Sequence, residues 1–250
     1  MNAVQRSAFG VVAMCFLAAA LKAEEKQVQT VKGWGEVLDP DGDCKVEERN
    51  GKLTVTVPGK YHDLWVGEGK VNAPRVLQNV EGDFSAQVLV TGVVHPEKGT
   101  LIPNIASTAP FQAGGLIIWK DDQTMVRLER TGFVNPTRGF GTSSYLQAFA
   151  DNKRYAEPEK NKVIDVAKRV EEKDTWLRLV RKEGKIYAAF SQDGEKTWSE
   201  MPGSGFTMDL PAKLRVGVEA IQTTTKDLTA EFKGFSVAKL PRITGASHAS

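Results

Sequence analysis

Cysteine and histidine are scarce in this 250-residue chain, which has only two cysteines and three histidines. Cys15 lies inside an apolar N-terminal run. If that run is removed, Cys44 is the single remaining cysteine and no intramolecular disulfide can form. The chain also has no His-x-x-x-His or paired-cysteine pattern, no Gly-x-Ser-x-Gly elbow and no phosphate-cradling glycine motif. The common metal-hydrolase, serine-hydrolase and nucleotide-binding classes therefore find no support in the sequence.

Neither sign of charge is in excess over most of the chain. The sequence has 33 lysine and arginine residues and 31 aspartate and glutamate residues. Residues 1–23 contain Arg6 and Lys22 but no acid, so residues 24–250 contain 31 residues of each sign. A balanced chain lacks the basic surface that neutralises phosphates, so we expect no nucleic-acid partner. We expect no membrane partner after signal cleavage either, because no long apolar run follows the N-terminus.

The first 23 residues have the pattern of a secretory signal peptide. Arg6 supplies the positive segment, residues 8–21 supply the apolar segment, and small residues up to Ala23 precede the polar residues 24–26. We therefore predict a secreted or periplasmic protein with a single domain over residues 24–238. Residues 239–250 are predicted to be a flexible C-terminal tail.

Alternation of apolar and polar residues dominates the rest of the chain, and helical periodicity is rare. Strands are predicted at 53–57, 84–90, 116–119, 125–130, 163–170, 176–180, 186–190, 214–220 and 230–237. The irregular stretches 95–112, 131–144 and 150–162 are predicted to be surface loops. Many short strands with frequent turn signals and scarcely any helix predict an all-β sandwich or barrel.

Strand parity separates a predicted core face from a polar face. Val126 and Leu128 fall on the core face, so Arg127 and Glu129 project from the opposite face. Aromatic rings beside arginines and carboxylates would form a groove suited to sugars, which stack on rings and hydrogen-bond to charged groups. The alternative is a solvated sheet face with cross-strand ion pairs. The candidate ligand-binding residues are Trp119, Arg127, Glu129, Arg178, Tyr187 and Glu219, with His62 and Arg75 at strand borders.

Three aspartates alternate along residues 39–43. Asp39, Asp41 and Asp43 are separated by a proline and a glycine. Several oxygens converging from a tight loop suit calcium, so these residues are a candidate calcium site. The loop is not an EF-hand, because Cys44 stands where that motif has its glycine. The alternative is an Asx-type turn, since Asp, Pro and Gly are favoured in turns.

Four segments of the chain resemble a known family. They are GWGEVLDPDGDC (33–44), HDLW (62–65), NAPRVLQNVEGDF (72–84) and AGGLIIWKDDQTMVRLER (113–130). Over residues 33–237 the chain is similar to the concanavalin A-like jelly-roll family of unknown function that is named after a "regulation of enolase" protein. The resemblance implies a jelly-roll sandwich of two antiparallel sheets, export, and an inferred carbohydrate-binding role. It implies no catalytic residues.

The sequence leaves three functions open. The first, which we favour, is a secreted, non-catalytic domain that binds a glycan or polysaccharide. The second is a glycoside hydrolase or related sugar-cleaving enzyme that uses Glu129 and Glu219, although the Glu-x-Asp-x-x-Glu run of laminarinase-type hydrolases on the same fold is absent. The third is a structural or protein-interaction module. Fold analogy alone does not make an enzyme.

Overall fold

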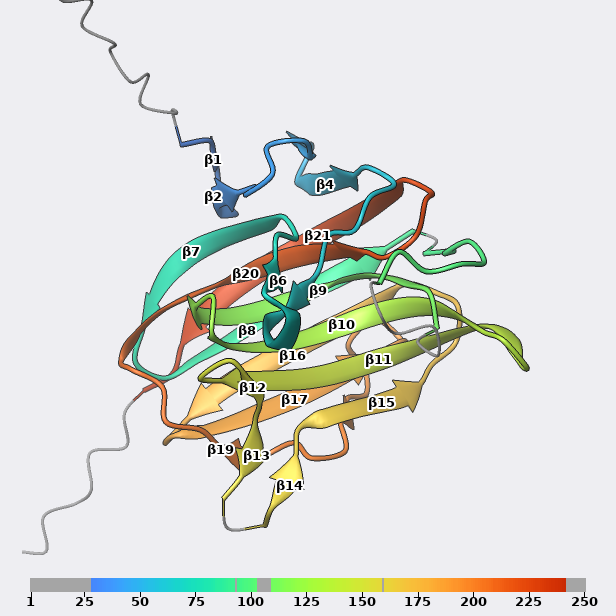
Figure 1. The fold of residues 1–250 in the computed structure, drawn as a ribbon. Coiled ribbons are helices and arrows are strands. Elements are labelled where there is room, and N and C mark those ends of the chain that lie inside the picture. Colours follow the sequence, from blue (N-terminus) through green and yellow to red (C-terminus); the bar gives the residue numbers. More distant parts are fainter. Residues whose placement is uncertain (1–27, 93, 103–108, 159, 242–250) are drawn as a thin grey trace, which may run out of the picture.

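The computed structural model describes residues 28–92, 94–102, 109–158 and 160–241 (Figure 1). The predicted signal peptide and residues 242–250 of the predicted tail lie outside the described residues. Lys239 is the last residue of a long strand, so that strand runs one residue past the predicted domain end. In the part of the chain that the structure describes, no helix is long and apolar enough to cross a bilayer.

Nine strands of the described residues form one antiparallel sheet. Their order is β1-β2-β7-β20-β9-β10-β11-β12, and β15 also pairs with β11. The bounds are β1 (Thr30–Val31), β2 (Gly35–Leu38), β7 (Arg75–Glu81), β9 (Phe111–Asp121), β10 (Thr124–Asn135), β11 (Gly139–Ala150), β12 (Lys153–Arg154), β15 (Asp165–Arg169) and β20 (Lys213–Gln222).

Eight further described strands form a second antiparallel sheet. Their order is β18-β17-β16-β8-β21-β4-β3, and β19 also pairs with β17. The bounds are β3 (Lys45–Arg49), β4 (Lys52–Val57), β8 (Phe84–Thr91), β16 (Thr175–Lys182), β17 (Lys185–Ser191), β18 (Ser199–Glu200), β19 (Phe206–Thr207) and β21 (Leu228–Lys239). Two small hairpins complete the described strands: β5 (Leu64–Trp65) pairs with β6 (Lys70–Val71) around the 3₁₀ turn η1 (Val66–Glu68), and β13 (Ala156–Glu157) pairs with β14 (Lys162–Val163).

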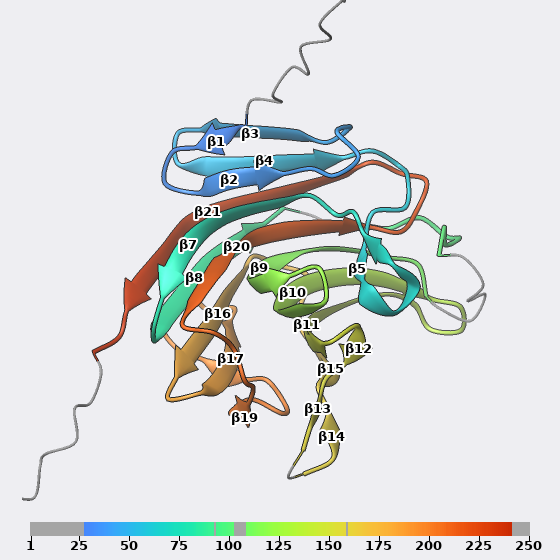
Figure 2. The same cartoon turned by 60° about the vertical axis from the view of Figure 1, so that its left-hand side comes forward.

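The two sheets pack face to face, and the predicted all-β sandwich is confirmed (Figure 2). Leu116, Leu128 and Val218 of the nine-stranded sheet share one buried cluster with Leu177 and Phe232 of the eight-stranded sheet. The alternating strands form these sheets because alternate side chains reach one shared core. The strand predicted at 163–170 is confirmed over β15, whereas Val163 belongs to β14, a separate strand of the small hairpin.

The loop predicted at residues 131–144 is wrong. These residues form the paired ends of β10 and β11, where Thr131 pairs with Ser143 and Phe133 pairs with Gly141. Only residues 136–138 remain as the turn. Polar and glycine residues hid the pairing, because they are typical of loops but also occur where a sheet carries a polar site.

A second, smaller cluster covers the outer face of the nine-stranded sheet, which is the face turned away from the sandwich core. Residues 61–74, which we call the covering segment, contribute Leu64, Val66 and Ala73 to this cluster. They pack against sheet residues that include Ile117 and Phe149. Figure 1 shows the covering segment lying across β9 and β10. Side chains on this face are therefore enclosed between the sheet and the segment.

Opposite faces of the eight-stranded sheet give a test of the architecture. Leu177 is fully buried in the core, whereas Tyr187 is 36% exposed on the other face. We expect Leu177→Ala to lower the unfolding free energy by about 2–5 kcal/mol, because it leaves a cavity. Tyr187→Ala should cost no more than about 1 kcal/mol. Urea denaturation measures both, and equal losses would contradict the assignment of faces.

Candidate functional site

One row of paired residues crosses the outer face of the nine-stranded sheet. Arg75 in β7 pairs with Glu219 in β20, and Glu219 pairs with Gly115 in β9. Gly115 pairs with Glu129 in β10, which pairs with Tyr145 in β11. Directly paired residues share a face of the sheet. The register therefore gathers two carboxyl groups, a guanidinium and a phenol in one row.

Arg127 lies in the next row and is the centre of the buried polar contacts. Its Nε donates to Gln147 Oε1 at 2.9 Å, and its Nη1 donates to Asp63 Oδ1 at 3.3 Å. Its Nε also lies 3.2 Å from Glu129 Oε1. Burial alone lowers the pKa of the guanidinium, but Glu129 and Asp63 outweigh burial and raise it. Arg127 therefore stays charged in a place that water barely reaches.

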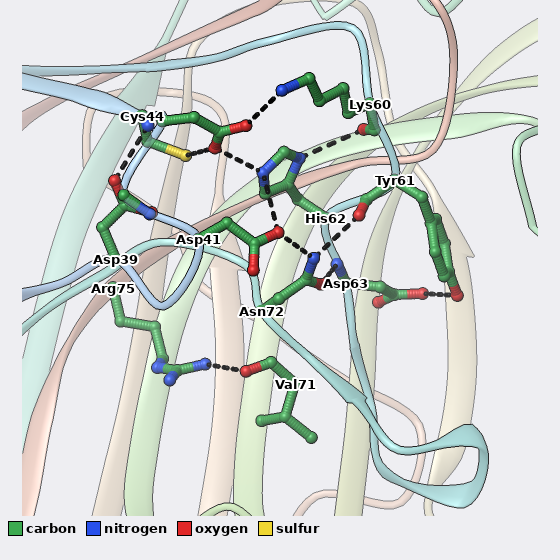
Figure 3. Close-up of polar contacts among 12 residues, drawn as sticks. Asp39, Asp41, Cys44, Lys60, Tyr61, His62, Asp63, Val71, Asn72 and Arg75 are labelled. Atoms are coloured by element: carbon green, nitrogen blue, oxygen red, sulfur yellow. Dashed lines mark hydrogen bonds and ion pairs between the residues drawn. The ribbon is translucent and has the colours of Figure 1, made fainter.

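Asp63 ties the covering segment to the sheet through Arg127, and Figure 3 shows its contacts with Tyr61 and Asn72 within the segment. Its carboxylate accepts hydrogen bonds from the Leu64 amide at 2.7 Å and from the Tyr61 hydroxyl at 3.1 Å, besides that from Arg127. Its own amide donates to Asn72 Oδ1 at 3.0 Å, which closes the segment on itself. Burial raises the pKa of Asp63, while the charge of Arg127 and the hydrogen bonds oppose this rise.

Glu129 and Glu219 form a fully buried carboxyl pair across Gly115. A Cβ atom on Gly115 would lie 2.8 Å from Glu219 Oε1 and 2.4 Å from a backbone oxygen of β10, so glycine is needed there. Burial raises the pKa of both carboxyl groups, for Glu129 to about 7, and the charge of Glu129 raises that of Glu219 further. Of the described N–H and O–H donors, none is aligned with their side-chain oxygens. A proton kept by one of the two groups would let that group donate a hydrogen bond to the other, which is the arrangement that the raised pKa values favour.

A cavity of about 410 Å³ opens beside Arg127 and Asp63. Its wall combines aromatic rings from the covering segment with rings and polar groups from the sheet. Arg154 lies at this wall, with its guanidinium 4.5 Å from the centre of the Trp65 ring and its Nε 3.0 Å from Asp165 Oδ2. The lining residues with rings or charges are Tyr61, Asp63, Trp65, Phe111, Arg127, Phe133, Tyr145 and Arg154.

A larger hollow of about 690 Å³ is lined by β7, β9 and β20 of the same sheet and by the end of β21 of the other sheet. Lys120, Lys213 and Arg215 line it together with Lys239. Its cations project from strand ends, and no ring is well exposed there because Trp119 is only 2% exposed. The smaller cavity is the better candidate for a binding site, because it joins aromatic rings to buried, oriented charges.

The predicted aromatic platform at Trp119 is wrong. The ring is buried in the cluster under the covering segment, and the Arg75 guanidinium stacks on it with a distance of 4.2 Å to the ring centre. Arg75 is itself 2% exposed, and burial lowers its pKa to about 10. Both residues lie on the predicted face, but they support the sheet instead of lining the cavity.

Arg178 and Tyr187 do not join the other predicted residues, because β16 and β17 belong to the eight-stranded sheet. Arg178 donates to Gln87 Oε1 at 2.9 Å and stacks over Trp198, 3.6 Å from its ring centre. The single groove predicted from strand parity is therefore wrong. Parity shows which face of a strand a residue occupies, but not which sheet that strand enters.

Arg127, Glu129 and Glu219 lie on the predicted face, opposite the core. All three are buried, however, and only Arg127 lines the cavity. The expected exposure of the two glutamates in an open groove is wrong, because the covering segment encloses this part of the sheet. Any role of these three residues in binding stays a prediction.

His62 points away from the cavity. It is fully buried, and its Nε2 lies 2.9 Å from Asp43 Oδ1 while its neighbours Tyr61 and Asp63 line the cavity. An extended segment produces this split, because successive side chains point to opposite sides. His62 therefore belongs with the loop of residues 39–44.

The three aspartates of that loop have different partners. Asp39 accepts hydrogen bonds from the Gly42 and Cys44 amides at 3.0 and 2.9 Å, so the Asx-type turn is confirmed there. Asp43 binds His62, and Asp41 Oδ2 accepts from the Asn72 side chain at 2.8 Å. The prediction that all three carboxylates converge on one calcium ion is therefore wrong for Asp39, whose oxygens are taken by backbone amides.

A different group of possible metal ligands exists beside this turn. Donor atoms of Asp43, Cys44 and His62 all lie within 4.8 Å of one another. Burial, followed by the charges of Asp39 and Asp43, raises the pKa of the Cys44 thiol. A nitrogen and a sulfur donor are not the oxygens that calcium prefers.

Most of the cavity wall lies outside the candidates predicted from the sequence. The missed residues include Tyr61, Asp63, Trp65 and Tyr145 of the wall, and Gln147, which binds Arg127. The alternation of residues 61, 63 and 65 is a usable signal, since it places three polar or aromatic side chains on one side of the segment of residues 61–65. Tyr145 and Gln147 alternate with buried apolar residues of β11 in the same manner.

Comparisons with known proteins identify the fold. No family model and no curated protein matches the chain, but solved structures do. A functionally unknown protein from Saccharomyces cerevisiae matches with a TM-score of 0.59 and 17% identity, over 83% of this chain and 97% of that one. A mutant GH43 protein from Bacillus licheniformis matches with a TM-score of 0.53 and 14% identity, over 86% of this chain and 38% of that one. A xylan β-1,4-xylosidase from Bacillus halodurans matches with a TM-score of 0.50 and 16% identity, over 78% of this chain and 34% of that one.

The chain is an all-β sandwich of two antiparallel sheets, and the finer assignment to the concanavalin A-like jelly rolls stays a prediction. It spans little more than a third of the two Bacillus proteins. At these identities the likeness concerns the fold, and the narrower resemblance to the "regulation of enolase" family stays a prediction.

Replacement of Gly115 tests the close approach of the two glutamates. We expect Gly115→Ala to destabilise the protein by about 1–3 kcal/mol or more, because the methyl group meets backbone as well as Glu219. Gly67→Ala is the control, since a Cβ there lies 3.4 Å from its nearest neighbour. Urea denaturation compares the two variants. A loss no larger than that of the control would show that the carboxyl groups are not held together across Gly115.

The buried carboxyl pair also predicts how stability depends on pH. The folded state holds protons that ordinary carboxyl groups release above pH 4.5, so unfolding free energy should fall as the pH rises from about 5 through 7 and beyond. Each unit of raised pKa corresponds to about 1.4 kcal/mol. Glu219→Gln should flatten this fall and make the variant the more stable protein at pH 8. Melting temperatures measured from pH 5 to 9 test this dependence of stability on pH. If the melting temperature of Glu219→Gln falls with pH as steeply as that of the unmodified protein, the shared proton is refuted.

Proposed function

We propose that this protein binds carbohydrate, without cleaving it, in the cavity beside Arg127 and Asp63. The observation that carries the proposal is the composition of the cavity wall. Trp65, Phe133 and Tyr145 offer ring faces, while Asp63 and Arg127 are charged groups held in place by several partners. Sugars bind in this manner, because their C–H faces stack on rings and their hydroxyls pair with fixed charges.

The size of the cavity supports a small part of a glycan as the ligand. Its volume of about 410 Å³ lies in the range of small-molecule pockets, which is roughly 300–1,000 Å³. The Trp65 ring is half-buried and stacks with Arg154, so the ring is preorganised before any ligand arrives. A preorganised ring loses little conformational freedom on binding.

The enclosure of Glu129 and Glu219 favours binding over catalysis. A glycosidase needs two carboxyl groups that reach the scissile bond, about 5–10 Å apart. Here both groups have no exposed surface, face each other across Gly115 and are absent from the cavity wall. Their raised pKa values result from burial and do not by themselves imply an acid–base role.

Two further parts of the proposal concern the class of sugar and the location of the protein. The GH43 protein and the xylosidase share the fold, so xylo-oligosaccharides are a reasonable first probe. The signal-peptide pattern of residues 1–23 supports export to the periplasm or the medium. A glycan or polysaccharide outside the cytoplasm is therefore the proposed partner.

Two tryptophans provide a matched test of the cavity. Trp65 and Trp198 are both half-buried, and each stacks with an arginine, but they lie on different faces of the molecule. We expect the purified protein to bind xylo-oligosaccharides or another glycan class on an array. Trp65→Ala should weaken that binding about 10-fold or more, because loss of a stacking ring removes on the order of 1.4 kcal/mol. Trp198→Ala should leave the affinity unchanged.

Isothermal titration calorimetry measures the affinities, and circular dichroism verifies that both variants fold. Equal effects of the two substitutions would place binding elsewhere. No binding across a broad array would reject glycan recognition for the classes displayed and favour a protein-interaction module. Release of shortened sugars, lost in Glu129→Gln, would instead establish a hydrolase.

A further inference from the structure

A cluster of metal-ligating side chains lies on the far side of the covering segment from the cavity. Its members, which we call the rim cluster, are Asp41, Asp43, Cys44 and His62 (Figure 3). His62 Nε2 lies 2.9 Å from Asp43 Oδ1 and 3.7 Å from Asp41 Oδ2. Cys44 Sγ lies 3.7 Å from the same Asp43 oxygen. The function proposed above uses none of these groups.

The surroundings of the His62 ring point to a ligand at Nε2. The ring is fully buried, and its Nδ1 lies 3.2 Å from the Lys60 carbonyl oxygen, which only accepts hydrogen bonds. Nδ1 must therefore carry a proton to be satisfied. Its Nε2 faces the carboxylates of Asp43 and Asp41. A ring whose Nδ1 donates to a carbonyl while Nε2 faces other ligand groups has the usual arrangement of a metal-bound histidine.

The spacing of the donors suits a small ion. Zinc lies about 2.0–2.3 Å from nitrogen, oxygen and sulfur ligands, so tetrahedral ligands are about 3.3–3.6 Å from one another. Three donor pairs in the rim cluster lie 2.9 to 3.7 Å apart, and the donor atoms of Asp43, Cys44 and His62 all lie within 4.8 Å of one another, so small movements bring them to that range. Calcium instead needs six to eight oxygens, and here Asp39 is engaged by backbone amides.

Groups outside the rim cluster hold its carboxylates in place. Lys60 Nζ lies 2.9 Å from Asp43 Oδ2, so the other oxygen of Asp43 is the one turned to His62. The Asn72 side chain donates to Asp41 and also to the Tyr61 carbonyl. Supporting contacts of this kind orient the ligands of metal sites.

We infer that Asp43, Cys44 and His62, with Asp41 in the fourth position, bind a divalent cation of the zinc class. A mixture of nitrogen, sulfur and oxygen donors selects such borderline ions over calcium and magnesium. The ion would join the loop of residues 39–44 to the covering segment. It would thereby fix the segment that carries Tyr61 and Asp63 to the cavity.

Cobalt provides a direct readout of the sulfur ligand. The full chain, purified without metal, is titrated with Co²⁺, and absorption in the near ultraviolet reports sulfur-to-cobalt charge transfer. We expect one equivalent to produce this band and Zn²⁺ to abolish it by displacement. Cys44→Ser should remove the band and weaken Zn²⁺ binding at least 10-fold.

Further variants keep the test decisive if one of them fails to fold. Asp43→Asn alters an exposed ligand and should weaken Zn²⁺ binding, whereas Asp39→Asn should not. Zn²⁺ binding of equal strength in Cys44→Ser, Asp43→Asn and the unmodified chain would overturn the inference, as would no binding by the folded protein. Ca²⁺ binding that Asp39→Asn abolishes would replace it with the calcium site predicted from the sequence.

Discussion

The outer face of this sandwich depends on one buried charge, the guanidinium of Arg127. A buried cation is costly unless carboxylates and hydrogen-bond acceptors surround it. Gln147 and Glu129 from the sheet supply part of that surrounding, and Asp63 supplies the rest from the covering segment. The need to satisfy Arg127 therefore fixes where residues 61–74 lie. The cavity wall follows from that position, because the same segment carries Tyr61 and Trp65.

The same constraint separates two kinds of polar group that look alike in sequence. Asp63 and Arg127 are buried but lie in the cavity wall, and each has oriented partners. Glu129 and Glu219 are fully buried beneath the segment, lie outside the cavity wall and face each other across Gly115. A carboxyl pair with raised pKa values is typical of many active sites, but burial alone also raises the pKa of a carboxyl group. Absence from the cavity wall therefore supports the proposal of binding over that of hydrolysis.

The sequence predicted the fold well because strand alternation is a local property. Alternation along one strand is enough to assign Val126 and Leu128 to the core face, whichever strands pair with it. The structure places both residues in the core. The site was harder to predict because it depends on pairing between distant segments. Arg178 and Tyr187 alternate as clearly as Arg127 does, yet their strands enter the other sheet. Trp119 lies on the correct face, but nothing near it in sequence shows that residues 61–74 cover it. The mispredicted loop at 131–144 has the same cause, since its pairing partner identifies it as strand.

The central claim is that ligand enters the cavity of the covering segment and reaches no other face. The side-chain N–H signals of the five tryptophans in a ¹⁵N-labelled sample test this most directly, because each reports its own surroundings. During titration with the glycan selected by the array, the Trp65 signal should shift with saturation. Signals of Trp119, beneath the segment, and of Trp198, on the other sheet, should stay in place. A saturating shift of Trp198 with an unmoved Trp65 would contradict the account.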